Sequence, residues 1–359
     1  MADAKIINYG QPINSSSDNL GVGDSDAIDT ITSGTKNIIL GISEDNFKLT
    51  SGSSNVFAGY KAGEDMSTGS DSVIIGHNAG TAVNNNANVF IGDDCGRVAT
   101  ADENVAIGKK AMENNTGSRC VAVGMQSLDA SGSPSFSTAV GHQSLSACTG
   151  QHNSALGYQA GLALTSGTDC VFIGRGATTG SATADNQVVL GANASGQGEN
   201  TVMLGDSTIT GLHCYTTTVT NPSDSRIKNN VQDSSLGLDF INALRPVKYE
   251  KKHPSEFPEE IREARWSDQT LTDIDGDGNE IETVRPADVK SADWQPKTEY
   301  GLIAQEVKAA MDAHGGADWQ GHTILPSGME ALGYGALITV LVKSVQELTV
   351  RIEQLEGGD

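Results

Sequence analysis

The sequence predicts a mainly β protein, in which a trimeric β-solenoid or β-roll shaft precedes an α+β domain that ends in a coiled-coil helix. Three observations predict this fold class. A short apolar run followed by Gly recurs along the first part of the chain. The composition changes near residue 220: thirty of the 42 glycines precede that point, and all three Trp residues follow it. The last residues carry apolar side chains at heptad spacing.

The repeat predicts the shaft. Its eleven glycines are spaced by 18, 17, 16, 16, 16, 17, 16, 17, 17 and 14 residues, which gives about eleven coils of 16–17 residues. Each unit predicts a short strand, a glycine turn and a polar loop, because Gly tolerates positive φ and close backbone approach. Strands of three or four residues are unstable alone, so stacked copies must pair and bury a continuous apolar stripe. The glycines are Gly41, Gly59, Gly76, Gly92, Gly108, Gly124, Gly141, Gly157, Gly174, Gly191 and Gly205.

A coil of this length encloses little volume, so a lone solenoid has a thin core. We therefore expect a homotrimer, with small apolar side chains on the threefold axis. The repeats resemble those of trimeric adhesin heads and of phage fibres. Two functions remain open for the shaft, a stiff spacer and a receptor-binding surface whose loops contact host glycans. No acidic pair stands at a spacing that marks a glycosidase site.

The bulk composition excludes several partner classes. The net charge is −22, shared equally between the two parts, and no basic patch is present to bind nucleic acid. No apolar run reaches membrane-spanning length, and no signal peptide is expected at the first residues. The five Cys residues form no CxxC pair, which favours free interior thiols in a protein made in a reducing host cytoplasm.

These features predict four segments. Residues 1–35 are rich in Ser, Asp, Gly and Asn, and their position suggests a virion-attachment segment that binds a tail or capsid protein, or a disordered leader. Residues 36–210 form the shaft, and residues 211–222 form a linker strand. Residues 223–359 form the C-terminal domain.

Three sequence blocks mark the last domain. Ser-Asp-x-Arg-x-Lys-x-Asn begins at Ser223, Leu-x-Pro-x-x-Tyr begins at Leu244, and Gly-x-Ile-Ala-Gln-Glu-Val contains Gln305 and Glu306. In this combination they resemble the intramolecular chaperone domain of phage endosialidase tailspikes and tail fibres, which also occurs in a eukaryotic membrane-tethered transcription factor. The resemblance extends to Glu356 and implies a trimer-forming chaperone that cleaves itself from the fibre.

The resemblance also implies the residues of the cut. Ser223 is the nucleophile, Lys228 is the base, and the chain is cleaved between Pro222 and Ser223. A serine hydroxyl needs a base within hydrogen-bond reach, and a lysine serves as a base only where burial removes it from water. Asp224 and Arg226 match the family block, and we expect them to hold the turn. Pro222 is a departure, because a proline directly before the cut restricts the geometry of the scissile bond. Slow or absent cleavage is therefore the alternative.

From the residues alone, the Asn-Pro-Ser-Asp stretch is instead a turn that opens the domain, with Ser223 or Asp224 as a helix cap. This interpretation involves no chemistry. The fibre then keeps its C-terminal domain as a permanent trimerisation cap.

The final helix is expected from about Tyr334 to Glu356. Its apolar residues are spaced 3, 4, 3, 4 and 3 apart, as in a coiled-coil seam. This spacing favours self-association, with packing on its own domain as the alternative. The seam residues are Ile338, Leu341, Val345, Leu348, Ile352 and Leu355.

No cofactor is expected. Asp273, Asp275 and Asp277 form a weak candidate for calcium, because Val284 stands where an EF-hand needs a bidentate Glu. Four of the seven histidines, His77, His142, His152 and His213, are interpreted as ordinary surface residues.

The function predicted from the sequence is therefore that of a phage fibre or spike protein located on the virion. Its expected partners are two further copies of the chain, a virion protein and a host-surface receptor. In the receptor-binding interpretation of the shaft, this receptor is a glycan. The alternatives are a non-cleaving adhesive fibre and a surface depolymerase.

Overall fold

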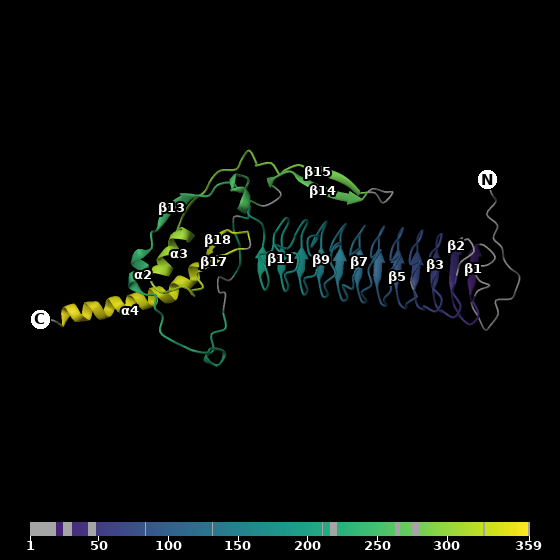
Figure 1. Ribbon diagram of the computed structural model, residues 1–359, viewed down its shortest axis with the longest axis horizontal. Coiled ribbons are helices and arrows are strands. Elements are labelled where there is room, and N and C mark those ends of the chain that lie inside the picture. Colours follow the sequence, from purple (N-terminus) through teal and green to yellow (C-terminus); the bar gives the residue numbers. More distant parts are fainter. Residues whose placement is uncertain are drawn as a thin grey trace. The chain divides into compact units, whose positions relative to one another are not determined.

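The computed structural model describes residues 19–23, 31–41, 48–82, 84–130, 132–209, 211–215, 221–262, 266–274, 280–325 and 327–357. The chain forms two compact units that divide between Ile209 and Thr210 (Figure 1). The first unit is a β-solenoid and the second mixes helices with short antiparallel strands. This confirms the predicted mainly β fold with a solenoid and a C-terminal helix.

The solenoid contains one parallel sheet of twelve strands, ordered as they occur in the sequence. Each strand pairs in register with the next, as in Val56↔Val73, so every coil repeats the one before it. The strands are β1 Leu20–Gly23, β2 Ile38–Gly41, β3 Val56–Ala58, β4 Val73–Ile75, β5 Val89–Ile91, β6 Val105–Ile107, β7 Val121–Val123, β8 Thr138–Val140, β9 Ser154–Leu156, β10 Val171–Ile173, β11 Val188–Leu190 and β12 Val202–Leu204.

The strand β1 lies within residues 1–35, the segment assigned above to a leader. Its residues Leu20–Gly23 pair with Ile38–Gly41, so the stacking begins earlier than expected. The glycine of this coil, Gly23, continues the repeat at a step of 18 residues, but its neighbours Gly21 and Asn19 hide the apolar run. At the other end, residues 211–215 of the expected linker strand form no strand, and residues 216–220 lie outside the described residues.

The corner glycines explain the repeat. Gly141 has φ +133°, and a Cβ atom there would lie 2.2 Å from the carbonyl oxygen of Gly157 in the next coil. A side chain at this position would push neighbouring coils apart, so the corner requires Gly. The same contact recurs along the shaft from Gly59 to Gly174.

Each coil buries the central residue of its strand. These residues include Phe57, Ile74, Phe90, Phe172 and Val189, which are 1% exposed or less. The residue before each strand also points inward and is mostly Asn or Ser. These side chains form a buried ladder that accepts backbone N–H groups of the next coil, since strands of three residues leave such donors unpaired. For example, Asn37 Oδ1 accepts from Asn55 N at 3.0 Å.

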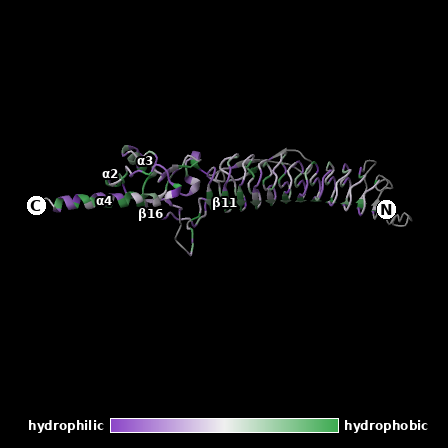
Figure 2. Cartoon of the chain, turned by 90° about the horizontal axis from the view of Figure 1, so that it is seen from below, coloured by the Kyte–Doolittle hydropathy of each residue, from purple (hydrophilic) through white to green (hydrophobic). Residues whose placement is uncertain are grey.

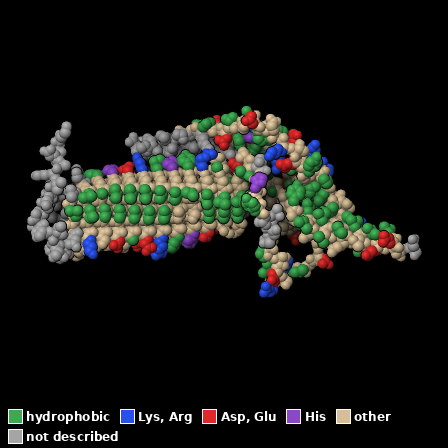
Figure 3. All heavy atoms as spheres, turned by 180° about the vertical axis from the view of Figure 1, so that it is seen from behind, with side chains coloured by type: hydrophobic (Ala, Val, Ile, Leu, Met, Phe, Trp, Pro, Cys, Tyr) green, Lys and Arg blue, Asp and Glu red, His purple; other side chains and the backbone are tan. Residues whose placement is uncertain are grey.

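The first and third residues of strands β2 to β12 point outward, and all are apolar except Thr138 and Ser154, which begin β8 and β9. They form two parallel rows along one face of the solenoid, shown in Figure 3, and the strands make a hydrophobic band along one side in Figure 2. Ile107 and Leu156, for example, are 39% and 53% exposed. We call this surface the strand face. Its third-position row is aliphatic throughout: Leu40, Ala58, Ile75, Ile91, Ile107, Val123, Val140, Leu156, Ile173, Leu190 and Leu204.

Four of the five cysteines fill the solenoid interior as free thiols, as expected. Burial raises the pKa of the Cys95 thiol to about 12 and that of Cys148 to about 11, which makes both unreactive. The expectation was wrong for Cys214, which is exposed.

The second unit packs around one small core formed by Leu236, Phe240, Val307, Ala310, Met311 and Val340. Its helices are α2 Leu238–Ala243, α3 Ala304–Ala313 and α4 Leu337–Glu356, with short 3₁₀ turns η1 Ser225–Ile227, η2 Pro254–Glu256, η3 Glu259–Ile261 and η5 Tyr334–Ala336. Its antiparallel pairs are β13 Val247–Glu250 with β16 Thr298–Gly301, β14 Gln269–Ile274 with β15 Glu280–Arg285, and β17 His322–Ile324 with β18 Glu330–Leu332. None of the helices in the described ranges is long and apolar enough to span a membrane.

The half-buried Asp129 gives the shaft a pH dependence. Burial and the nearby Glu113 raise the pKa of its carboxyl from 3.8 to about 7. Folding therefore takes up a proton, and this contribution to stability is complete below about pH 4 and is lost as the pH rises to 7.

Asp129→Asn should therefore raise the thermal unfolding temperature of the shaft at pH 8, because no ionised carboxylate is then buried. The gain should shrink toward zero at pH 4. Circular dichroism melts at both pH values measure the effect, and Asp102→Asn at an exposed position serves as the control. An equal gain at both pH values would contradict the assignment to this carboxyl.

Candidate functional site

The candidate site is the turn that opens the second unit. Asp224 caps the 3₁₀ turn η1, and its carboxylate accepts from Arg226 N at 2.9 Å. The Arg226 guanidinium also binds both carboxylate oxygens, with a shortest N–O distance of 2.6 Å. The side-chain and backbone hydrogen bonds from Arg226 hold the pKa of Asp224 below its ordinary value. These hydrogen bonds join the side chains of Asp224 and Arg226 across the start of the turn.

This turn brings the Lys228 side chain back to Ser223, the residue before the Asp224 cap. Lys228 N donates to Ser225 O at 3.2 Å and ends the turn, and Lys228 Nζ lies 2.6 Å from Ser223 Oγ. A hydroxyl and an amine are therefore in direct contact beside the Pro222–Ser223 peptide bond. Pro222, Ser223 and Lys228 are all exposed in the single chain.

The other two sequence blocks meet in the same unit. Arg245 Nε donates to Glu306 Oε2 at 3.0 Å, and a second guanidinium contact completes the ion pair. The hydrogen bond from Arg245 lowers the pKa of Glu306. Gln305 is exposed on α3. Glu306 therefore ties the strand β13 to α3, and the two motif residues lie outside the Ser223 turn.

A third contact holds the blocks together. A Cβ atom at Gly301 would lie 2.4 Å from Tyr334 Oη, and this hydroxyl accepts from Leu302 N at 2.9 Å. The glycine of the third block thus makes room for the tyrosine that opens the C-terminal helix region.

The helix α4 uses one face within its own unit. Val340 and Ser344 are buried there, and Glu347 Oε2 accepts from Leu238 N at 2.8 Å at the start of α2. The predicted seam lies on other positions and is 42–81% exposed. The helix therefore packs on its own domain, as the alternative expected, but through residues other than the seam. The exposed seam consists of Ile338, Leu341, Val345, Leu348, Ile352 and Leu355.

Sequence reasoning missed the capping role of Glu347. A signal was present, because α2 follows Gly237 and has no capping side chain of its own. A Cβ atom at Gly237 would lie 2.6 Å from the Glu347 carboxylate, so this glycine admits the distant cap.

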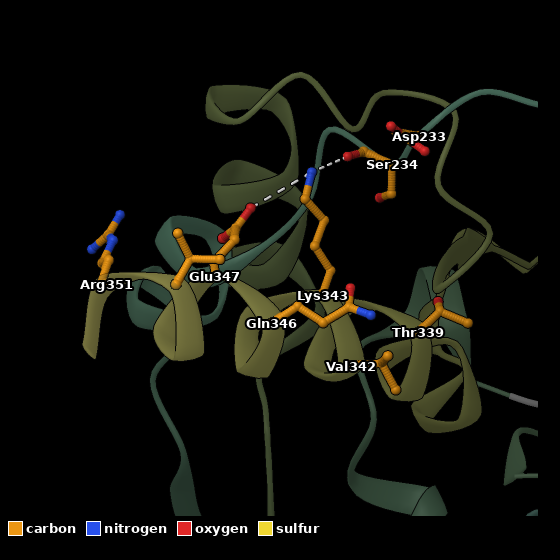
Figure 4. A pocket seen from close by; sticks show the side chains of 9 residues that line it. Asp233, Ser234, Thr339, Val342, Lys343, Gln346, Glu347 and Arg351 are labelled. Carbon is orange, nitrogen blue, oxygen red and sulfur yellow. Dashed lines mark hydrogen bonds and ion pairs between the residues drawn. The ribbon is translucent and has the colours of Figure 1, made fainter. Parts of the chain in front are cut away.

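An open groove of the second unit lies between α4 and residues 233–234 (Figure 4). Lys343 crosses it, contacts Ser234 O and lies 3.6 Å from Glu347. These polar groups hold the segment on α4, and the groove contains no nucleophile–base pair. Its lining is Asp233, Ser234, Thr339, Val342, Lys343, Gln346, Glu347, Val350 and Arg351.

The calcium candidate lies outside what the structure describes. Asp275 and Asp277 lie outside the described residues, as does the side chain of Asp273. In the described part of the shaft, His77, Asp93 and Asp94 come together from two coils. Lys109 and Arg97 already lie 3.5 and 4.0 Å from those carboxylates, so the cluster is neutralised within the protein.

The comparison with protein families decides the identity of this unit. Residues 223–316 match the model of a family described as chaperone of endosialidase. The second unit is a chaperone-of-endosialidase domain. No curated protein and no solved structure matches the chain. A β-solenoid followed by this domain is the organisation of a tailspike-type protein, which confirms the predicted resemblance. The family match thus supports a phage fibre with an intramolecular chaperone domain.

The Glu347 cap allows a direct test of how α4 is held. Glu347→Ala should lower the free energy of unfolding of the chaperone domain by about 1 kcal/mol, because the N-terminus of α2 loses its acceptor. Urea unfolding followed by tryptophan fluorescence measures the loss. Glu353→Ala, one and a half turns later on the same helix, is the matched control. Equal effects of the two variants would show that the Glu347 contact does not stabilise the domain.

Proposed function

We propose that this protein is a trimeric virion fibre whose chaperone domain assembles the three shafts and then cleaves itself from them between Pro222 and Ser223. The observation that carries the proposal is the Ser223 turn. The family match begins at Ser223, and Lys228 Nζ lies 2.6 Å from its hydroxyl oxygen. A serine nucleophile and its base at this distance are the minimum arrangement for acyl transfer.

The proposed reaction has two steps. Ser223 Oγ attacks the carbonyl carbon of Pro222, and its proton passes to the neutral amine of Lys228. That proton then goes to the Ser223 amide nitrogen as the C–N bond breaks, which leaves an ester between the Pro222 carbonyl and Oγ. Water hydrolyses the ester, and the products are a shaft ending at Pro222 and a chaperone domain with a free amine at Ser223.

Burial connects this reaction to assembly. A lysine becomes a base when its ammonium is removed from water, and a serine hydroxyl depends on such a base. In the single chain both side chains are exposed. Packing of three copies around the turn would supply the missing burial, so cleavage would follow assembly and unassembled chains would stay intact.

Two apolar surfaces on one chain support the trimer. The strand face runs along the whole solenoid, and the seam of α4 is exposed where the helix leaves its own domain. Soluble proteins rarely leave apolar surfaces of this extent uncovered. Three copies would cover both, with the strand faces toward one axis and the helices in a coiled coil.

The order of assembly follows from contact range. Contacts between separate shafts are non-local and slow to form, and exposed strands invite aggregation. Chaperone domains that associate first would hold the shafts at high local concentration and equal height. Removal of these domains would eliminate the template for refolding and leave the shaft kinetically trapped.

The fibre would be located on the virion, attached through its N-terminal residues to a tail or capsid protein, with the shaft as a spacer or a receptor-binding surface. The match to the chaperone family supports a phage origin. The acidic shaft is suited to a soluble, extended component of the virion. Host glycans are the proposed receptor class for the loops.

Intact mass under denaturing conditions tests the cleavage. Wild type should give two fragments, one ending at Pro222 and one starting at Ser223. Ser223→Ala and Lys228→Ala should stay whole, because each removes one partner of the acyl transfer. Ser225→Ala, in the same turn, is the matched control and should be cleaved. An uncleaved wild type would make the domain a permanent trimerisation cap, the alternative function.

Sedimentation velocity tests the coiled-coil seam. Val345→Asp places a charge on the seam and should convert the trimer to folded monomers, because three buried carboxylates would face one another. Gln354→Asp adds the same charge to the exposed helix surface and should leave the trimer intact. A trimer in both variants would show that α4 does not hold the copies together.

A further inference from the structure

Two columns of side chains border the strand face. The first edge consists of the residues two positions before each strand from β3 onward, and all of them are exposed. They are Ser54, Asp71, Ala87, Glu103, Arg119, Phe136, His152, Asp169, Asn186 and Asn200. The second edge consists of the residues after each corner glycine, and all are exposed or half-buried. They are Tyr60, His77, Asp93, Lys109, Met125, His142, Tyr158, Arg175, Ala192 and Asp206.

Contacts between successive coils link neighbouring residues along much of each edge. Along the first edge, Arg119 Nε donates to Glu103 at 2.6 Å and its guanidinium lies over the Phe136 ring at 5.5 Å. Phe136 stacks on His152 at 5.3 Å, and His152 lies 3.5 Å from Asp169.

The second edge is built in the same way. Tyr60 stacks on His77 at 5.6 Å, and His77 Nδ1 lies 2.8 Å from Asp93. Further along, His142 stacks on Tyr158 at 5.3 Å. Figure 3 shows charged and histidine side chains gathered along both margins of the apolar rows.

The two edges are complementary when residues of the same coil are compared. Three coils offer opposite charges or an acid with a histidine: Asp71 with His77, Glu103 with Lys109, and Asp169 with Arg175. Two coils offer aromatic rings on both edges: Phe136 with His142, and His152 with Tyr158. None of the ten coils places like charges on its two edges.

A shift by one coil destroys this match. In one direction Glu103 would face Asp93 and Arg119 would face Lys109, two like-charge pairs. In the other direction Asp71 would face Asp93. Like charges held together at an interface are unfavourable, so the complementarity selects one alignment.

The two residues of a pair are separated by the strand within one chain. Asp169 and Arg175 stand six residues apart, with β10 between them, which corresponds to roughly 15–20 Å of extended chain. Arg175 is exposed, and among the described residues it has no carboxylate within 4.0 Å. Asp169 contacts His152 within its own column, whereas Arg175 is left without a carboxylate on its own chain among the described residues.

We propose that the first edge of one shaft binds the second edge of a neighbouring copy, coil for coil, and that these pairs set the register of the trimer. The proposal rests on the trimer of the proposed function. A closed threefold assembly has one kind of interface, in which one edge of each copy meets the other edge of the next. With the strand faces toward the axis, rotation without translation brings equal coils together. The strand face is thus covered by neighbouring copies of the chain, which the charges on the two edges align.

Disulfide trapping tests the register. In a Cys214→Ser background, which removes the exposed native thiol, Asp169→Cys combined with Arg175→Cys should form covalent trimers on a non-reducing gel after oxidation. A bond within one chain is out of reach, because disulfides need Cα atoms within about 7 Å. The matched off-register pairs are Asp169→Cys with Tyr158→Cys and Asp169→Cys with Ala192→Cys, and both should remain largely monomeric on the gel.

Charge reversal provides a second measurement that needs no new bond. Asp169→Arg and Arg175→Asp should each lower the unfolding temperature of the trimer, and the double variant should recover most of the loss. Recovery identifies a contact between copies, because the two side chains do not meet within one chain.

The outcomes separate the two proposals. Stronger trapping by an off-register pair, or additive charge-reversal effects in a trimer, overturns the coil-for-coil register while the trimer stands. A wild-type protein that sediments as a monomer overturns the trimer itself and the register with it.

Discussion

Parallel pairing between successive coils is the constraint on which this structure depends. A strand of three residues has too few hydrogen bonds to persist alone, so each coil is stable only against its neighbours. The glycine corners and the inward Asn and Ser ladder serve this pairing. Gly141 lets Gly157 approach within contact distance, and Asn37 accepts a backbone donor from Asn55. Every other feature of the shaft follows from this short repeat.

The short repeat also leaves an apolar surface exposed along the shaft. A coil that buries one central side chain per strand has its other two strand residues outside, and these are apolar in nearly every coil. Such a surface is a template for aggregation until it is covered. A chaperone-of-endosialidase domain follows the shaft in the chain. In the proposed function this domain brings the copies together so that the strand faces are covered.

Within that domain the helix α4 performs two tasks on different faces. Val340 and Ser344 pack inside, and Glu347 caps α2, so the helix is fixed at its base. The seam residues remain exposed. The Ser223 turn is exposed as well, with the Ser223 hydroxyl and the Lys228 amine in contact. In the proposed assembly, burial between copies is the one physical change that would affect both the seam and the turn.

The sequence by itself determined the features that repeat or that depend on neighbouring residues. The solenoid was predictable because each strand and glycine recurs at a nearly constant step, and the helix seam because heptad spacing is local. The Ser223 turn was also readable, since Asp224, Arg226 and Lys228 act within five residues of one another. The strand β1 was missed because its coil departs from the apolar triplet.

Only the tertiary structure decided which distant residues meet. Glu347 lies 109 residues from the Leu238 amide that it caps, and Arg245 lies 61 residues from Glu306. No local pattern specifies such contacts, because they arise when separate elements pack around a common core. The edges of the strand face are the same case. Their residues look like ordinary loop positions in the sequence, and stacking of the coils in register turns them into columns.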